Sequence, residues 1–308
     1  MRQEEFNFLS ADGHTTIHGV EWIPDGKARA IIIILHGVTE NIMRYEKFAQ
    51  YFTEKNYVVA GAEHLGHGRS IGQSGLSMYF GPKGSWNWIV EDAHTTYKYI
   101  KRKYSERNIP VIFFGFSLGS FVLRDYMIRY PQDLSTAVIA GTGQTNAAVL
   151  TIMQGIVKIQ EILHGEKTVT SLIKALTFGT YNKHFAPNRT EYDWLCANES
   201  ELDKYIADPL RGEYMTVGLF RELLYGMKRT GSLENIKRGN IAVPVLFLSG
   251  SEDAVGDFTK GVQAAEKLFE KAEYKDIGYK IFPEMRHDVL HEKNSSEVLD
   301  YIRNWIEK

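Results

Sequence analysis

The feature that most restricts the fold of this chain is a series of short apolar runs separated by longer segments with helical periodicity. The runs span 31–35, 57–62, 111–114, 136–140, 243–248 and 279–282, and the periodic segments span 45–52, 88–104, 118–130, 258–271 and 295–306. Short runs rich in β-branched residues are typical of strands buried on both faces of a parallel sheet, because the crossover helices cover both faces. The alternation therefore predicts an α/β fold with a mostly parallel, doubly wound sheet.

The amino-terminal segment has a different pattern. Phe6 and Phe8 alternate with polar residues, and Ile17, Val20 and Trp22 follow on the other side of the turn signal at 12–13. Alternation on both sides of an Asp-Gly turn predicts a β-hairpin. We therefore expect two antiparallel strands at the start of the sheet.

Residues 144–238 interrupt the alternation, since this stretch contains helical periodicity and polar turns but no convincing strand. The apolar residues of 147–163 exceed what a surface helix with one buried face can hide, so we expect a second surface to cover them. A length of 308 residues allows one large core with an insertion. The sequence predicts a core formed by 1–143 and 239–308, with a helical cap inserted at 144–238.

Composition and charge exclude several classes of protein. The 36 basic and 38 acidic residues leave a net charge of -2, which gives no field to attract nucleic acid. No apolar run approaches the ~20 residues of a membrane-spanning helix, so no stable membrane anchor is expected. The amino terminus lacks the apolar stretch of a signal peptide, and the single Cys196 cannot form an internal disulfide. We expect a cytoplasmic protein, and nothing in the sequence specifies its oligomeric state.

The motif Gly115-Phe-Ser117-Leu-Gly119 directly follows an apolar run and opens a helical segment. This is the context of a nucleophile elbow, a tight turn that exposes a serine at the end of a strand. A side chain at either glycine would collide with the neighbouring strand or helix. Ser117 is therefore the candidate nucleophile.

A serine hydroxyl becomes a good nucleophile when a histidine removes its proton and a carboxylate orients that histidine. In the nucleophile-elbow fold the chain order is serine, acid, histidine, with the last two in loops after late strands. Asp253 follows the strand predicted at 245–249, and His287 follows the strand predicted at 279–282. They complete the predicted triad. The competitors are Glu252 and Asp257 for the acid and His291 for the base, although His291 falls in a predicted helical start.

Hydrolysis also requires two backbone N–H groups that stabilise the oxyanion of the tetrahedral intermediate. One comes from the residue after the nucleophile and one from the loop after an early strand, which here are Leu118 and Val38. His36 precedes that loop and fits a buried structural histidine better than a catalytic one. The stretch 66–68, Gly-His-Gly, lacks the third glycine and the Lys-Ser/Thr of a phosphate-binding loop, so we do not expect nucleotide binding.

These motifs resemble those of a known superfamily. They are His36-Gly-Val-Thr-Glu40, Gly61-Ala-Glu-His-Leu-Gly-His-Gly-Arg-Ser70, Gly115-Phe-Ser-Leu-Gly119, Gly250-x-x-Asp253 and His287-Asp-x-x-x-Glu292. In this order they resemble the α/β-hydrolases, in particular the monoacylglycerol lipase and lysophospholipase-like serine hydrolases. The region from 182–194 to 208–209 resembles the cap of bacterial lysophospholipase-like members, which implies a helical cap over the pocket. Glu63 departs from the aspartate common in the family, at a position that belongs to a structural turn.

The motifs predict a serine hydrolase that cleaves carboxylic esters through an acyl-enzyme formed on Ser117. Its expected partner is a small monoacyl ester, and no metal or organic cofactor is implied. The apolar and aromatic residues of the cap either line an acyl tunnel or form the core of the cap itself. An aminopeptidase, a thioesterase or an acyltransferase on the same triad remains an alternative, as does a ligand-binding protein without turnover.

Overall fold

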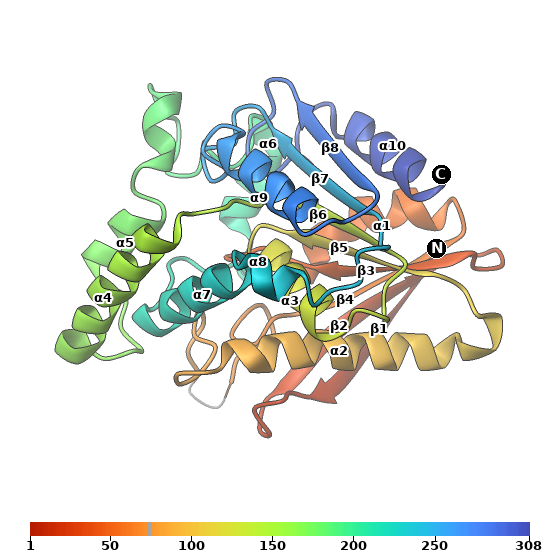
Figure 1. The fold of residues 1–308 in the computed structure, drawn as a ribbon, viewed down its shortest axis with the longest axis horizontal. Coiled ribbons are helices and arrows are strands. Elements are labelled where there is room, and N and C mark those ends of the chain that lie inside the picture. The colour runs from red at the N-terminus through yellow and green to blue at the C-terminus, as the bar shows by residue number, and fades with distance from the viewer. Residues whose placement is uncertain (73–74) are drawn as a thin grey trace.

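The computed structural model describes residues 1–72 and 75–308, and within them the strands form one eight-stranded sheet (Figure 1). Its order is β1-β2-β4-β3-β5-β6-β7-β8. The strands are β1 (Arg2–Leu9), β2 (Thr16–Ile23), β3 (Ala30–Leu35), β4 (Tyr57–Ala62), β5 (Val111–Phe116), β6 (Thr136–Ala140), β7 (Val245–Gly250) and β8 (Ile277–Phe282). All the predicted strands are present.

The pairing follows the burial pattern of the strands. β1 and β2 form the predicted antiparallel hairpin, and β2 also pairs antiparallel with β4. The strands from β4 across to β8 pair in parallel. β3, β4, β5, β6 and β7 are buried at every residue, as strands covered on both faces must be. The predicted doubly wound, mostly parallel sheet is confirmed.

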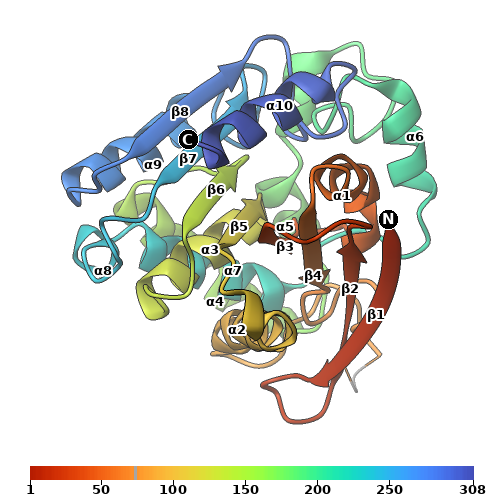
Figure 2. The same ribbon diagram turned by 90° about the vertical axis from the view of Figure 1, so that its right-hand side faces the viewer.

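Helices cover both faces of the sheet, and Figure 2 shows α1 and α10 on one face and α2, α3 and α9 on the other. The two faces bury separate apolar clusters, with β3 supplying Ile32 and Ile34 to one and Ile31 and Ile33 to the other. These helices are α1 (Glu46–Thr53), α2 (Trp86–Lys103), α3 (Leu118–Arg129), α9 (Lys260–Lys271) and α10 (Ser295–Ile306). The helix predicted at 258–271 begins only at Lys260, because residues 257–259 have positive φ angles.

The strand order reverses at β3, whose neighbours are β4 on one side and β5 on the other. The chain therefore leaves β3 and β5 in opposite directions, and a crevice opens between the two loops that follow them. Ser117 begins one of these loops and residues 36–40 form the other. Ligands of open α/β sheets bind at this position.

Between β6 and β7 the described chain contains helices and no strand. The elements are α4 (Ala147–His164), α5 (Ser171–Thr177), η3 (Tyr181–Phe185), α6 (Glu199–Ala207), α7 (Val217–Thr230) and α8 (Leu233–Ile236). α4, α5 and α7 gather to one side of the sheet (Figure 1). Of the residues that the structure describes, no helix is both long and apolar enough to cross a lipid bilayer.

The expectation that a second surface covers α4 is wrong. Leu150 and Val157 are buried on one face of the helix. The opposite side leaves Ile152 66% and Ile162 73% exposed. The apolar excess of α4 reflects an open outer face, because only one side of this helix packs against α7 and the neighbouring elements.

Arg124 of α3 binds both the start and the end of the segment that contains α4 to α7. Its guanidinium is fully buried and donates to the carbonyl oxygens of Gly143 and Thr230 and to Oε1 of Gln144, at 3.0, 3.0 and 2.7 Å. Burial without a carboxylate partner lowers the pKa of Arg124 to about 9. A single side chain thus connects the first residues after β6 with the end of α7.

Gly119 provides a test of how tightly α3 meets the sheet. A Cβ at this position would overlap the carbonyl oxygens of Leu35 and His36, which are backbone atoms at the end of β3. We expect Gly119→Ala to lower the free energy of unfolding by about 1–3 kcal/mol, the usual cost of overpacking. The measurement is urea denaturation followed by circular dichroism.

Gly155→Ala is the matched control. Gly155 lies inside α4, and a Cβ there would meet nothing within 4 Å. This change should raise the free energy of unfolding by up to about 1 kcal/mol, since alanine favours helix over glycine. A Gly119→Ala protein as stable as the wild type would refute the close contact between α3 and β3.

Candidate active site

Ser117 lies in a strained turn between β5 and α3. Its φ of 51° and ψ of -116° fall outside the regions that a serine ordinarily adopts. The turn is fixed because the Ser117 N–H donates to the carbonyl oxygen of Ala140 at 3.0 Å and the Ser117 carbonyl accepts from Ser120 Oγ at 2.5 Å. This backbone conformation, between the end of β5 and the first residue of α3, is the one expected for a nucleophile elbow.

Asp253 and His287 are in direct contact. His287 Nδ1 lies 2.9 Å from Asp253 Oδ1, and both side chains are buried. Asp253 also accepts hydrogen bonds from Ser249 Oγ and from the N–H groups of Val255 and Gly256. Because Nδ1 of His287 faces Asp253, Nε2 lies on the side of the ring that points away from Asp253.

The electrostatics of this pair follow from burial and charge. Burial alone would lower the pKa of His287, but the Asp253 carboxylate outweighs burial and raises it. Burial alone would raise the pKa of Asp253, but His287 and the donated hydrogen bonds lower it. Each partner therefore favours the charged form of the other.

The competing residues lie elsewhere or have other partners. Glu252 Oε2 pairs with His184 Nε2 at 3.1 Å. Asp257 is exposed at the edge of the cavity described below. His291 contacts Asp288 at 2.8 Å and the carbonyl oxygen of Arg44 at 3.1 Å. The prediction that His291 enters a helical start is wrong, because α10 begins only at Ser295.

The loop after β3 is held by two buried histidines. The N–H of His64 donates to His36 Nε2 at 2.9 Å, and His64 Nε2 lies 2.9 Å from the carbonyl oxygen of His36. Since His36 Nε2 accepts, its proton is on Nδ1, which donates to the Gly37 carbonyl at 2.7 Å. Burial, with His64 and His67 beside it, lowers the pKa of His36 well below its usual range. The neutral ring is structural, as expected from the sequence.

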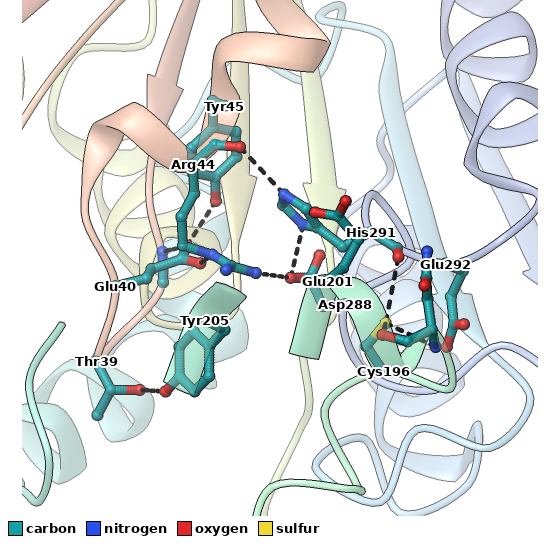
Figure 3. A network of polar contacts seen from close by, with 12 residues as sticks. Thr39, Glu40, Arg44, Tyr45, Cys196, Glu201, Tyr205, Asp288, His291 and Glu292 are labelled. Atoms are coloured by element: carbon teal, nitrogen blue, oxygen red, sulfur yellow. Dashed lines mark hydrogen bonds and ion pairs between the residues drawn. The ribbon is translucent and has the colours of Figure 1, made fainter. Parts of the chain in front are cut away.

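A charged network joins this loop to the segment that carries His287 (Figure 3). Glu40 accepts from the Gly37 N–H at 2.5 Å, from Tyr45 Oη at 2.8 Å and from Arg44 Nε at 3.1 Å. Arg44 Nη2 donates at 2.7 Å to Asp288, the residue directly after His287. Sequence reasoning did not identify this role, although Glu40 and Asp288 both lie within the quoted motifs.

Helix α6, which follows β6 in the chain, contacts the same loop. Tyr205 Oη of α6 lies 2.8 Å from Thr39 Oγ1, as Figure 3 shows, and Thr39 Oγ1 donates to the Val38 carbonyl at 2.6 Å. Thr39 has a φ of 61°, which is rare for a β-branched residue. The strained loop is thus closed partly by a side chain that is distant in the sequence.

A cavity of about 210 Å³ brings the predicted site residues together. Ser117, Leu118, Val38 and His287 all line it, while Asp253 lies behind His287. Most of its remaining walls are apolar and come from the helices after β6. Among the apolar and aromatic residues of 144–238, the lining includes Met153, Phe178, Trp194, Met215, Phe220, Leu223, Leu224 and Met227. Phe185 and Tyr192 are not part of this lining and pack instead below Arg286 and Arg211.

Glu63, the departure from the family motif, lies in the turn below this site. It is buried 3.5 Å from His36 Nε2, and burial raises the pKa of its carboxyl to about 8. The side chain fills the space that Gly68 leaves open, since a Cβ on Gly68 would overlap its carboxyl group. Its position is structural and outside the cavity lining.

Known proteins resemble this chain along nearly its whole length. A family model described as "Serine aminopeptidase, S33" matches residues 26–294. The monoacylglycerol lipase of Mycolicibacterium smegmatis is 24% identical over 310 residues, which cover 99% of this chain and 97% of the relative. The monoglyceride lipase of Rattus norvegicus is 24% identical over 288 residues, which cover 89% of this chain and 84% of the relative.

A solved structure confirms the fold. A thermostable carboxyl esterase from Bacillus coagulans, in complex with glycerol, aligns with a TM-score of 0.89 at 23% sequence identity. The alignment covers 99% of each chain. The expected α/β-hydrolase fold is therefore present, with a sheet of mostly parallel strands and helices on both faces.

The coupling between Asp253 and His287 predicts a titration. In the unfolded chain a histidine titrates near ~6.5. The pKa of His287 is raised in the folded protein, so its pairing with Asp253 stabilises the fold when His287 is protonated. This stabilisation is complete below the pKa of the unfolded chain and is lost as the pH rises through the pKa of the folded protein. In Asp253→Asn, burial remains and the opposing charge is gone, so the His287 pKa should fall below the ordinary value.

NMR titration of the histidine ring protons measures this shift. Asp257→Asn is the control, because Asp257 is an exposed carboxylate at the cavity edge and is not in contact with His287. The control should leave the His287 pKa unchanged. An unchanged pKa in Asp253→Asn would contradict the assigned electrostatics.

Proposed function

The chain belongs to the serine aminopeptidase S33 family of α/β-hydrolases, in its monoacylglycerol lipase-like branch, and we propose that it is a serine hydrolase of carboxylic esters. The observation that carries this proposal is the cavity that joins Ser117, at its strained turn, with the His287–Asp253 pair. A strained serine that shares a cavity with a buried His–Asp pair fits the arrangement of an activated nucleophile. Two related proteins named as lipases of monoacyl glycerides support the ester as the bond that is cleaved.

In the proposed mechanism Ser117 attacks the ester carbonyl while His287 accepts its proton. Asp253 holds the imidazole with Nδ1–H toward the carboxylate, so that Nε2 is the atom that takes up the proton. The N–H groups of Val38 and Leu118 stabilise the oxyanion, and the position of Leu118 at the amino terminus of α3 favours negative charge there. His287 returns the proton to the leaving alcohol, and water then hydrolyses the acyl-enzyme.

The substrate we propose is a monoacyl ester whose acyl chain lies under residues 144–238, acting as a helical cap. Support comes from the apolar side chains that α4, α5 and α7 contribute to the cavity, among them Met153, Leu176 and Leu223. Each buried methylene contributes up to about 0.8 kcal/mol of binding. Polar side chains such as Thr39 and Tyr205 lie on the loop side of the cavity, where an alcohol leaving group would find partners.

Peptide hydrolysis is the second candidate, because the matching family model carries an aminopeptidase description. An aminopeptidase must hold the ammonium group of its substrate, which favours a carboxylate near the nucleophile. Asp257 and Glu40 line the cavity, but Glu40 already accepts hydrogen bonds from Gly37, Arg44 and Tyr45. The other carboxylate among the described lining residues, the exposed Asp257, lies 3.9 Å from Lys260 Nζ. The apolar walls of the cavity favour the ester.

A series of p-nitrophenyl esters beside aminoacyl arylamides tests the proposal. We expect kcat/KM to rise from acetate to octanoate, by up to about fourfold for each methylene that the cavity buries. A steady fall along the series would contradict the acyl tunnel. Faster cleavage of an aminoacyl arylamide than of every ester would assign the protein to peptide hydrolysis instead.

Two tryptophan substitutions on α4 locate the acyl chain. Met153 lines the cavity, whereas Val149 of the same helix is 46% exposed. Met153→Trp should therefore lower kcat/KM for octanoate at least tenfold while acetate hydrolysis is retained, and Val149→Trp should leave the chain-length profile unchanged. Equal effects of the two substitutions would place the acyl chain elsewhere.

A further inference from the structure

A short segment of the insertion, residues 193–198, is bound along the loop that carries His287. The N–H of Asp288 donates to the Leu195 carbonyl at 2.7 Å, and the N–H of His287 approaches the Trp194 carbonyl at 3.5 Å. Arg286 Nη1 donates to the carbonyl oxygen of Asp193. The backbone of the insertion thus contacts three consecutive residues centred on His287.

Glu292 holds the two segments together at their other end. Its buried carboxylate accepts the N–H of Ala197 at 3.0 and 3.1 Å, one distance for each oxygen, and the N–H of Arg286 at 2.9 Å. Cys196 Sγ adds a contact at 3.2 Å to the carbonyl oxygen of His291 (Figure 3). One carboxylate therefore binds a backbone group of the insertion and a backbone group of the loop at once.

The residues on both sides of His287 are fixed by these contacts. The N–H of Arg286, directly before it, is bound by Glu292, and the N–H of Asp288, directly after it, is bound by Leu195. The indole of Trp194 lies 5.6 Å from the imidazole, measured between ring centroids. Asp253 orients the ring itself, but the position of the backbone that carries the ring depends on Glu292 and the 193–198 segment.

We propose that Glu292 is a positioning residue for His287, and that the 193–198 segment of the insertion is a structural part of the catalytic site. The inference rests on the proposed function, in which His287 is the base. According to this inference the insertion has a role beyond substrate selection, because its backbone positions His287.

The physical reason lies in the charge of Glu292 and in the way its oxygens are shared between the two segments. Oε1 accepts from the N–H groups of both Arg286 and Ala197, and Oε2 accepts from Ala197 as well. Hydrogen bonds to an ionised carboxylate are stronger than those to a neutral oxygen. A glutamine with its oxygen in the Oε1 position would lose the charge, and its NH2 group would face the Ala197 N–H in place of Oε2. An alanine has none and leaves both N–H groups buried without a partner. A misplacement of the base by about 1 Å is enough to reduce turnover about 100-fold.

The test uses Glu292→Gln and Glu292→Ala in the full chain, with Glu297→Gln as the control on an exposed glutamate of α10. For a p-nitrophenyl ester we expect kcat to fall about tenfold in Glu292→Gln and about 100-fold in Glu292→Ala, with KM within a factor of about two. Labelling by a small fluorophosphonate should slow by the same factors, because it depends on the base and hardly on the cap. Glu297→Gln should match the wild type in each assay.

Hydrogen exchange of the amides of residues 286–288 provides a readout that does not depend on activity. Exchange should accelerate in both Glu292 variants while the amides of β7 stay protected. Arg286→Met is a second variant in case Glu292→Ala does not fold. It releases the carbonyl oxygens of Asp193 and Cys196 and leaves the backbone N–H groups on Glu292 in place. It should also lower kcat at constant KM.

The outcomes separate this inference from the proposed function. A wild-type protein that neither hydrolyses esters nor reacts with the probe would overturn the proposed function, whatever exchange shows. An active wild type whose Glu292 variants keep kcat and raise KM would overturn the positioning role and make the segment a substrate contact. Unchanged exchange at 286–288 in Glu292→Ala would overturn it as well.

Discussion

The site depends on how closely α3 approaches the end of β3. Gly119 lies in the first turn of α3, and any side chain there would overlap the carbonyl oxygens of Leu35 and His36. Because glycine allows the contact, the turn at Ser117 and the loop that contains Val38 lie next to each other. The proposed nucleophile and both proposed oxyanion donors therefore come together through backbone packing, before any side-chain interaction is considered.

Charge and hydrogen bonding then connect this center to the third loop, which carries His287. Arg44 lies between Glu40 on the loop after β3 and Asp288 beside His287, so a single guanidinium bridges the two loops. From the opposite side, the backbone of residues 193–198, between β6 and β7, binds the same loop. A buried cation between carboxylates is costly to break, because removing one partner leaves an uncompensated charge. The loops are thus held in one arrangement from two directions.

Much of this could be predicted from the sequence, because the informative signals are local. Buried runs identify the strands, and Ser117, Asp253 and His287 each follow a strand, at the end of the sheet where sites of this fold class occur. The later start of α9 could not be predicted, since the positive φ angles at 257–259 have no marker in their residue types. The open face of α4 was missed for a related reason, as apolar residues do not reveal whether another surface covers them. Contacts such as Tyr205 with Thr39 or Glu292 with Ala197 are single hydrogen bonds between distant parts of the chain. The periodicity of apolar residues does not predict such contacts.

The most direct test of the account is the location of a covalent adduct. After reaction with a fluorophosphonate, peptide mass spectrometry should find the phosphonyl group on Ser117 and on no other residue, and Ser117→Ala should remain unmodified while keeping the wild-type circular dichroism spectrum. An adduct on another residue, or undiminished ester hydrolysis by Ser117→Ala, would contradict the central claim that this strained serine is the nucleophile.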